Sequence, residues 1–95
     1  MDKLDKLKLL KLQSQQVLAK LQQLTVETEI TKIFAQEARI LSKELGMCES
    51  ALHECLFELD NANGRLSIAI RKLTGDVRWL DQEIRQEKRY LVDIN

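Results

Sequence analysis

Leucine recurs at every seventh position through the second half of the chain. The row consists of Leu45, Leu52, Leu59, Leu66, Leu73 and Leu80. Side chains seven apart share one helix face, so we assign this row to position d of a heptad repeat. Position a then holds Leu56, Asn63, Ile70, Val77, Ile84 and Leu91. Leu at d, branched residues at a and a single Asn at a favour a two-stranded coiled coil with parallel strands.

Turn-forming residues interrupt this pattern in the stretch LDNANGRLSIAI, residues 59–70. Asp60, Asn61, Asn63 and Gly64 are residue types that end helices and make tight turns. They favour a corner at about 61–64, between a helix over about 47–60 and a second one over about 65–93. The alternative is one continuous helix, in which Asn63 would be a buried polar residue that fixes the register of the strands. The turn chemistry narrowly favours the corner.

The first half of the chain predicts a helix over about 2–45 whose apolar face shifts along its length. Leu7, Leu10, Val17, Leu21 and Leu24 keep the phase of the ladder, but Thr28, Thr31, Ala35 and Ala38 occupy the positions that follow. The large apolar residues move nearly half a turn around the helix. They are Val26, Ile30, Ile33, Phe34, Ile40 and Leu41. We expect either a break near 25–31 or a change of partner along one helix.

A second apolar row appears in the C-terminal half. Phe57, Ile68, Trp79 and Tyr90 recur every eleven residues, which is close to three full turns. They lie opposite the leucine ladder, so a lone pair of helices would leave them in water. Such a stripe predicts packing in a larger bundle or, as the alternative, a groove for a ligand helix.

Composition supports an all-α chain. The sequence has no proline and only three glycines, with 44% hydrophobic, 32% charged and 4% aromatic residues. We therefore expect residues 1–95 to form a single all-helical domain, an elongated hairpin or small bundle with heptad packing. A long coiled-coil helix that oligomerises is the alternative.

Charge is balanced overall but unevenly distributed. Residues 1–24 carry five lysines and two aspartates, residues 25–64 carry eight acids and three bases, and residues 65–95 carry seven bases and five acids. An acidic middle between basic ends favours a chain folded back on itself, or staggered pairing with a second copy. We expect no nucleic acid partner, because the sequence shows no segment with a purely basic face.

No motif predicts chemistry. Cys48, His53 and Cys55 lack the spacing of a zinc site, and His53 points away from Cys48 around a helix. The acids Glu27, Glu29, Glu37 and Glu44 are expected on a solvated helix surface. The sequence therefore predicts no catalytic site, no metal, no cofactor and no enzyme activity.

The opening MDKLDKLKLLKL contains lysines and leucines, as a basic amphipathic membrane anchor does. Lys11 falls between Leu4 and Leu7 on the helical wheel, and Asp2 and Asp5 weaken attraction to anionic lipid. Membrane attachment is therefore not expected. Two cysteines are too few for a disulfide framework, which predicts a reducing, cytoplasmic location.

Residues 37–73 can also be divided into three short helices around GM and NANG. With Ala62, Asn63, Gly64, Leu66 and the pair Ala69–Ile70, the second half resembles a ubiquitin-associated-type module, as also found at the N-terminus of translation elongation factor Ts. The stretch between GM and NANG is longer than in that module, and GM reverses the usual Met-Gly order. The resemblance implies three short helices, and we transfer no ubiquitin-binding residue from it.

These patterns predict a protein–protein interaction module, a structural or adaptor subunit of a homo- or hetero-oligomeric coiled-coil assembly. The alternative is a small helical chaperone or regulator that masks a client's amphipathic helix. Its partners would be other helical proteins or itself. Asn63 and Gly64 are the predicted register or turn residues. The predicted interface residues are Leu52, Leu59, Leu66, Leu73, Leu80, Ile70, Val77, Ile84, Phe57, Ile68, Trp79 and Tyr90.

Overall fold

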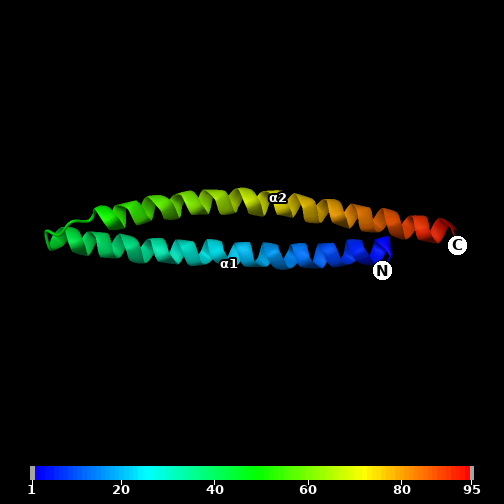
Figure 1. The fold of residues 1–95 in the computed structure, drawn as a ribbon, viewed down its shortest axis with the longest axis horizontal. Coiled ribbons are helices and arrows are strands. Elements are labelled where there is room, and N and C mark those ends of the chain that lie inside the picture. Colours follow the sequence, from blue (N-terminus) through cyan, green and yellow to red (C-terminus); the bar gives the residue numbers. More distant parts are fainter. Residues whose placement is uncertain (1, 95) are drawn as a thin grey trace.

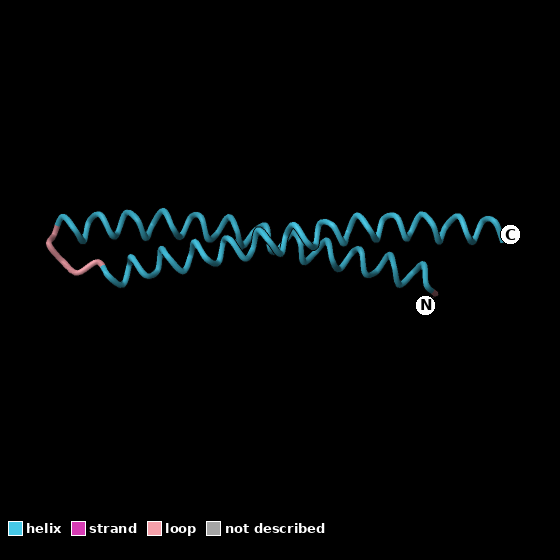
Figure 2. Tube along the Cα trace, turned by 90° about the horizontal axis from the view of Figure 1, so that it is seen from above, coloured by secondary structure: helices cyan, strands magenta, loops and turns pink. Residues whose placement is uncertain are grey.

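Two long antiparallel helices form an elongated hairpin (Figure 1). The structure is a computed structural model that describes residues 2–94. Helix α1 spans Lys3–Glu44 and helix α2 spans Ser50–Ile94. The molecule measures 77 × 16 × 15 Å. Seen from above, the helices cross at a shallow angle, with the loop at one end of the rod (Figure 2). The expected all-α, elongated hairpin is confirmed.

Helix α1 is continuous through residues 25–31, where a break was one of two expectations. Three threonines in this stretch return their hydroxyls to the backbone one turn earlier. Thr25 donates to the Leu21 carbonyl, Thr28 to Leu24 and Thr31 to Glu27, at 2.7–3.0 Å. Because each hydroxyl is satisfied within the helix, these residues do not draw the backbone into a turn. At its start, the Asp2 carboxylate caps α1 by accepting from the Asp5 amide at 2.8 Å.

The corner of the hairpin lies at residues 45–49 and depends on Gly46. The Met47 amide donates to the Ser42 carbonyl at 2.9 Å, and the Gly46 amide donates to Lys43 at 3.1 Å. This pair of bonds is a Schellman motif, which needs a residue in the left-handed region at the position after the C-cap. Gly46 supplies it with φ +68°, the positive φ found within residues 2–94. The motif satisfies the last carbonyls of α1 and reverses the chain.

The corner expected at 61–64 is wrong, because α2 runs through these residues without interruption. Asp60, Asn61 and Asn63 all have helical backbone, and Gly64 lies on the exposed outer side. The helices expected over 47–60 and 65–93 are therefore one helix. The three short helices implied by the ubiquitin-associated resemblance are likewise not formed. Side-chain packing along the ladder outweighs the turn preference of a few polar residues, as tertiary context commonly does.

The two helices face each other along positions of reduced exposure that alternate by three and four residues. On α2 these include Leu52, Leu56, Leu59, Asn63, Leu66, Ile70, Leu73, Val77, Leu80 and Ile84. On α1 they are Leu4, Leu7, Lys11, Ser14, Leu18, Leu21, Thr25, Thr28, Lys32, Ala35, Arg39 and Ser42. We call these two rows the seam. Within the described residues, the buried apolar side chains are Leu56, Leu80 and Ile84, all on α2. Helix α1 therefore contributes a largely polar row to the seam.

The glycines provide a direct test of where the chain turns. A Cβ at Gly64 would meet nothing within 4 Å, and the site is exposed helix interior. Gly64→Ala should therefore raise the free energy of unfolding by about 1 kcal/mol. Gly46→Ala should lower it by about 1 kcal/mol, because Ala resists a positive φ. Urea unfolding followed by circular dichroism measures both values. Destabilisation by Gly64→Ala would contradict a continuous α2.

Candidate protein-interaction surfaces

Ion pairs cross the seam along its whole length and align the helices. Lys3 pairs with Glu87 at 3.6 Å and Arg39 with Glu49 at 3.6 Å. Between them, Lys11 pairs with Asp81 and Lys32 with Asp60. As the residue number rises on α1, that of its partner falls on α2, as antiparallel register requires. In each of these four pairs the base belongs to α1, and the acid belongs to α2 or, for Glu49, to the corner just before it.

Two of these pairs shift the pKa of one member. A hydrogen bond from Lys11 holds the pKa of Asp81 below its ordinary value, and the positive charges of Lys11 and Arg85 add to the effect. The hydrogen bond to Asp60 raises the pKa of Lys32, helped by the negative charges of Asp60 and Glu29. Both groups are solvent-accessible, so these pairs specify register more than they add stability.

Asn63 occupies the seam and bonds across it. Its Nδ2 donates to Glu29 Oε1 of α1. Its Oδ1 is buried and has no hydrogen-bond partner. A polar side chain held in this way has a matching partner in only one alignment of the helices, which is the role that the continuous-helix alternative gave to Asn63.

The predicted ladder residues lie between the two helices of the same chain. Leu80 is 2% exposed and Ile84 is also buried, while Leu52, Leu59, Leu66, Leu73, Ile70 and Val77 are half-buried. Leu45 belongs to the corner and is exposed. Of the α1 residues in phase with the ladder, Leu7 and Leu21 lie in the seam, whereas Leu10, Val17 and Leu24 are exposed, because α1 turns Lys11, Lys32 and Arg39 towards their acids.

The eleven-residue row lies on the outer side of α2 and is uncovered. Trp79 is 56% exposed and Tyr90 is 60% exposed, and Phe57 and Ile68 are exposed as well. We call these four residues the aromatic stripe. The hairpin leaves all four largely exposed. Phe57, Trp79 and Tyr90 border open grooves that α1 also lines, so the row does not lie opposite the ladder throughout.

A further uncovered row was not among the predicted interface residues. Val26, Ile30, Ile33, Phe34, Ile40 and Leu41 are all exposed, with Phe34 at 64%. We call these six residues the outer α1 stripe. Their spacing of three and four residues marks one helix face, and that face points away from α2. The sequence already carried this signal as the shift of the apolar face after residue 24. The sequence did not show whether that face points towards α2 or away from it.

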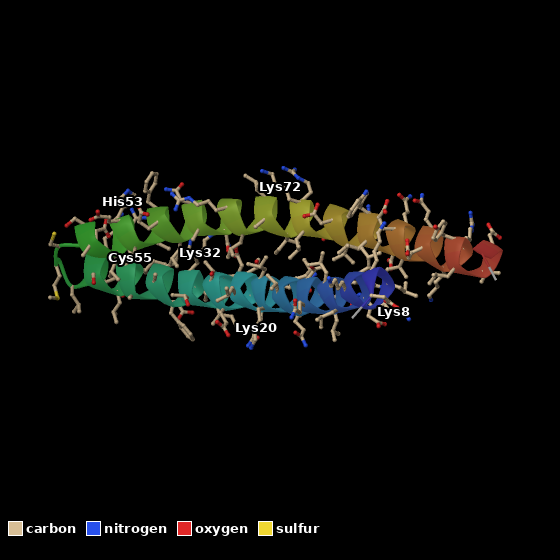
Figure 3. The ribbon with its side chains drawn as sticks, turned by 45° about the vertical axis from the view of Figure 1, so that its right-hand side comes forward. Lys8, Lys20, Lys32, His53, Cys55 and Lys72 are labelled. Carbon is tan, nitrogen blue, oxygen red and sulfur yellow. The ribbon has the colours of Figure 1, made fainter. Side chains whose placement is uncertain are left out.

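The residues considered for chemistry are dispersed. Cys48 lies in the loop before α2, with its sulfur 3.2 Å from the Ser50 hydroxyl, and hydrogen bonds from Ser50 lower the pKa of the Cys48 thiol. His53 and Cys55 are exposed on α2 (Figure 3). Among residues 2–94, no three His, Cys, Asp or Glu side chains gather as metal ligands would. Open grooves line the hairpin, one of them bordered by Lys32, Gln36, Arg39, His53, Leu56, Phe57 and Asp60.

Within the described residues, neither helix contains a segment that is both long enough and apolar enough to cross a bilayer. The chain matches no protein-family model, no curated protein and no solved structure. The surfaces of the hairpin therefore provide the basis for inferring its function.

Leucine truncation separates seam from surface. Leu80→Ala should lower the free energy of unfolding by about 3 kcal/mol, because it removes a buried side chain and leaves a cavity. Leu24→Ala is the matched control, since Leu24 is 46% exposed in the hairpin, and it should cost less than about 1 kcal/mol. Both are measured by urea unfolding of the dilute protein. Equal losses would contradict the rotation of α1 described above.

The Lys11–Asp81 pair predicts how stability depends on pH. The folded pKa of Asp81 is depressed, so its contribution is present above the unfolded pKa and is lost as pH falls through the folded pKa. The melting temperature should fall on acidification, and it should fall less in Asp81→Asn. Circular dichroism melts of both proteins between neutral and strongly acidic pH measure the difference. Identical acid profiles would show that the pair contributes nothing.

Proposed function

We propose that this chain is a non-enzymatic helical interaction module, a structural or adaptor subunit that is completed by packing against further helices in a coiled-coil-like assembly. One observation carries the proposal. Nineteen of the described large apolar side chains are exposed, whereas three apolar side chains are buried. Scattered exposed leucines are ordinary, but a row of large apolar side chains along one helix face, such as the outer α1 stripe, is typical of a contact surface.

The solvent-accessible surface area shows how much more surface the hairpin exposes than a compact monomer does. The hairpin exposes 7382 Å², whereas a compact monomer of 11.0 kDa exposes about 5,600 Å². Its radius of gyration is 21.4 Å, compared with about 12 Å for a compact chain of this length. The difference in area is about twice the roughly 800 Å² that each partner contributes to a standard protein interface. A partner helix or hairpin on the outer faces would cover surface on this scale.

The same exposed rows suit the second candidate, a chaperone or regulator that shields a client's amphipathic helix. The two functions differ in when the stripes are covered. A subunit of a stable assembly has them covered in its resting state, whereas a chaperone keeps them open until its client arrives. The outer α1 stripe, open along its length in the isolated hairpin, is the observation that favours keeping this candidate.

Light scattering and an apolar-surface dye distinguish these functions. A stable oligomer with weak dye fluorescence supports the structural subunit. A monomer with strong fluorescence that is quenched by an added amphipathic helical peptide supports the chaperone. Phe34→Asp should reduce dye binding or oligomerisation several-fold without loss of helicity, because Phe34 is 64% exposed in the hairpin. A monomer that binds no dye would contradict both functions.

A further inference from the structure

One part of the outer side of α2 forms a basic face. Between residues 64 and 89, the positions that point away from α1 are all exposed and contain no acid. Figure 3 shows one of these residues, Lys72, on the side of α2 away from α1, opposite in direction to Lys20 of α1. Ile68 and Trp79 of the aromatic stripe lie within this face. Its bases are Arg65, Arg71, Lys72, Arg78, Arg85 and Arg89.

The hairpin itself produces this face by sorting charges. The same stretch of α2 also contains acids, but Asp81 and Glu87 turn to the seam and pair there with lysines of α1. Glu83 is half-buried, and the exposed Asp76 flanks the face beside Trp79. The six bases are engaged in none of the ion pairs found within residues 2–94. In the linear sequence the acids and bases alternate, which concealed the face. The expectation that no segment has a purely basic face therefore does not describe the folded chain.

The outer α1 stripe has the complementary character. Glu27, Glu37 and Glu44 are exposed beside its six apolar side chains. The bases Lys32 and Arg39 from the same region turn inward, where they pair with Asp60 of α2 and Glu49 of the corner. Lys43 is the one exposed base near this stripe. The region from 26 to 44 thus presents an apolar and acidic face about 27 Å long, and the basic face from 65 to 89 is about 36 Å long.

We infer that the outer α1 stripe of one chain packs on the basic face of a second copy, with Trp79 and Ile68 contacting its apolar side chains. This inference rests on the proposed interaction function and names one partner for it. Opposite charges lie along both faces, and each face lacks cover in the hairpin. A second copy is the partner whose acidic and apolar face is present in the molecule itself.

The two faces point in opposite directions from the hairpin, one beyond α1 and the other beyond α2. One copy therefore cannot use both faces against the same neighbour. The contact is heterologous, and such contacts build rings or open arrays rather than closed two-fold dimers. The mass of the wild-type protein should rise with concentration past that of a dimer.

Charge exchange tests the contact. Arg78→Glu with Arg85→Glu should raise the concentration for half-assembly by about 100-fold, because acids would then oppose acids. Glu37→Lys with Glu44→Lys should do the same, because bases would oppose bases. Mixing the two variants, or placing all four changes in one chain, restores opposite charges and should return assembly to within a few-fold of wild type. Multi-angle light scattering measures mass, and circular dichroism verifies helicity.

Lys6→Glu with Lys88→Glu is the matched control. It makes the same change in net charge at exposed sites off both faces, and it should shift half-assembly by less than about threefold. Failure of the mixture to assemble, or an equal effect of the control, would overturn the inference. A wild-type monomer that binds the apolar dye would overturn this inference while leaving the interaction function intact, whereas a dye-silent monomer would overturn both.

Nucleic acid is the other kind of partner that a basic face could bind, and a labelled DNA duplex added to each protein tests for it. The expected result is no binding that depends on Arg78 and Arg85 at moderate salt. Tight, steeply salt-dependent binding lost in Arg78→Glu with Arg85→Glu, from a wild-type protein that does not self-assemble, would assign the face to nucleic acid and reject the second copy.

Discussion

The polar row that α1 presents to α2 is the constraint on which the rest of the structure depends. Lys11, Lys32 and Arg39 occupy positions where a coiled coil ordinarily places apolar side chains. Their partners are the acids Asp81, Asp60 and Glu49, so charge aligns the hairpin, and leucines close it, more of them from α2 than from α1. With its polar row inward, α1 directs its large apolar residues outward. The exposed stripes are thus a consequence of how the hairpin is paired.

The same pairing links the fold to the proposed function. Because Asp81 and Glu87 approach α1, the outer side of α2 is basic over residues 64–89. Because Lys32 and Arg39 turn to Asp60 and Glu49, the outer side of α1 is apolar and acidic over residues 26–44. A conventional hairpin with two apolar rows would bury its hydrophobic residues and would leave mixed charges outside. Here the interior contact is modest, with three buried side chains in the described residues, and the surfaces available for other helices are extensive. Stability of the isolated chain and capacity for assembly are therefore in competition.

Sequence patterns predicted the seam of α2 because it is built from one residue type at one interval. Leu52 to Leu80 face α1 as the ladder required, and the continuity of the ladder was a better guide than Asn63 and Gly64 to the course of the chain. The corner was misplaced because the local turn preference of residues 60–64 favoured that stretch, whereas the chain reverses at Gly46. The rotation of α1 could not be predicted, because it depends on acids that approach only after the corner is fixed at Gly46. For the same reason the outer α1 stripe could be seen as a pattern but not assigned a direction.

The position of the corner also determines which end of the rod opens first. Every contact across the seam closes a loop of chain that contains Gly46. This loop is short for the Arg39–Glu49 pair and longest for the Lys3–Glu87 pair. Loop-closure entropy grows with length, so pairing near the corner is the least costly to form and nucleates the hairpin. The end of the rod away from the corner therefore closes last and opens first. Backbone amides should be protected from exchange in a gradient along the rod, and the ends of the chain form its most readily remodelled part.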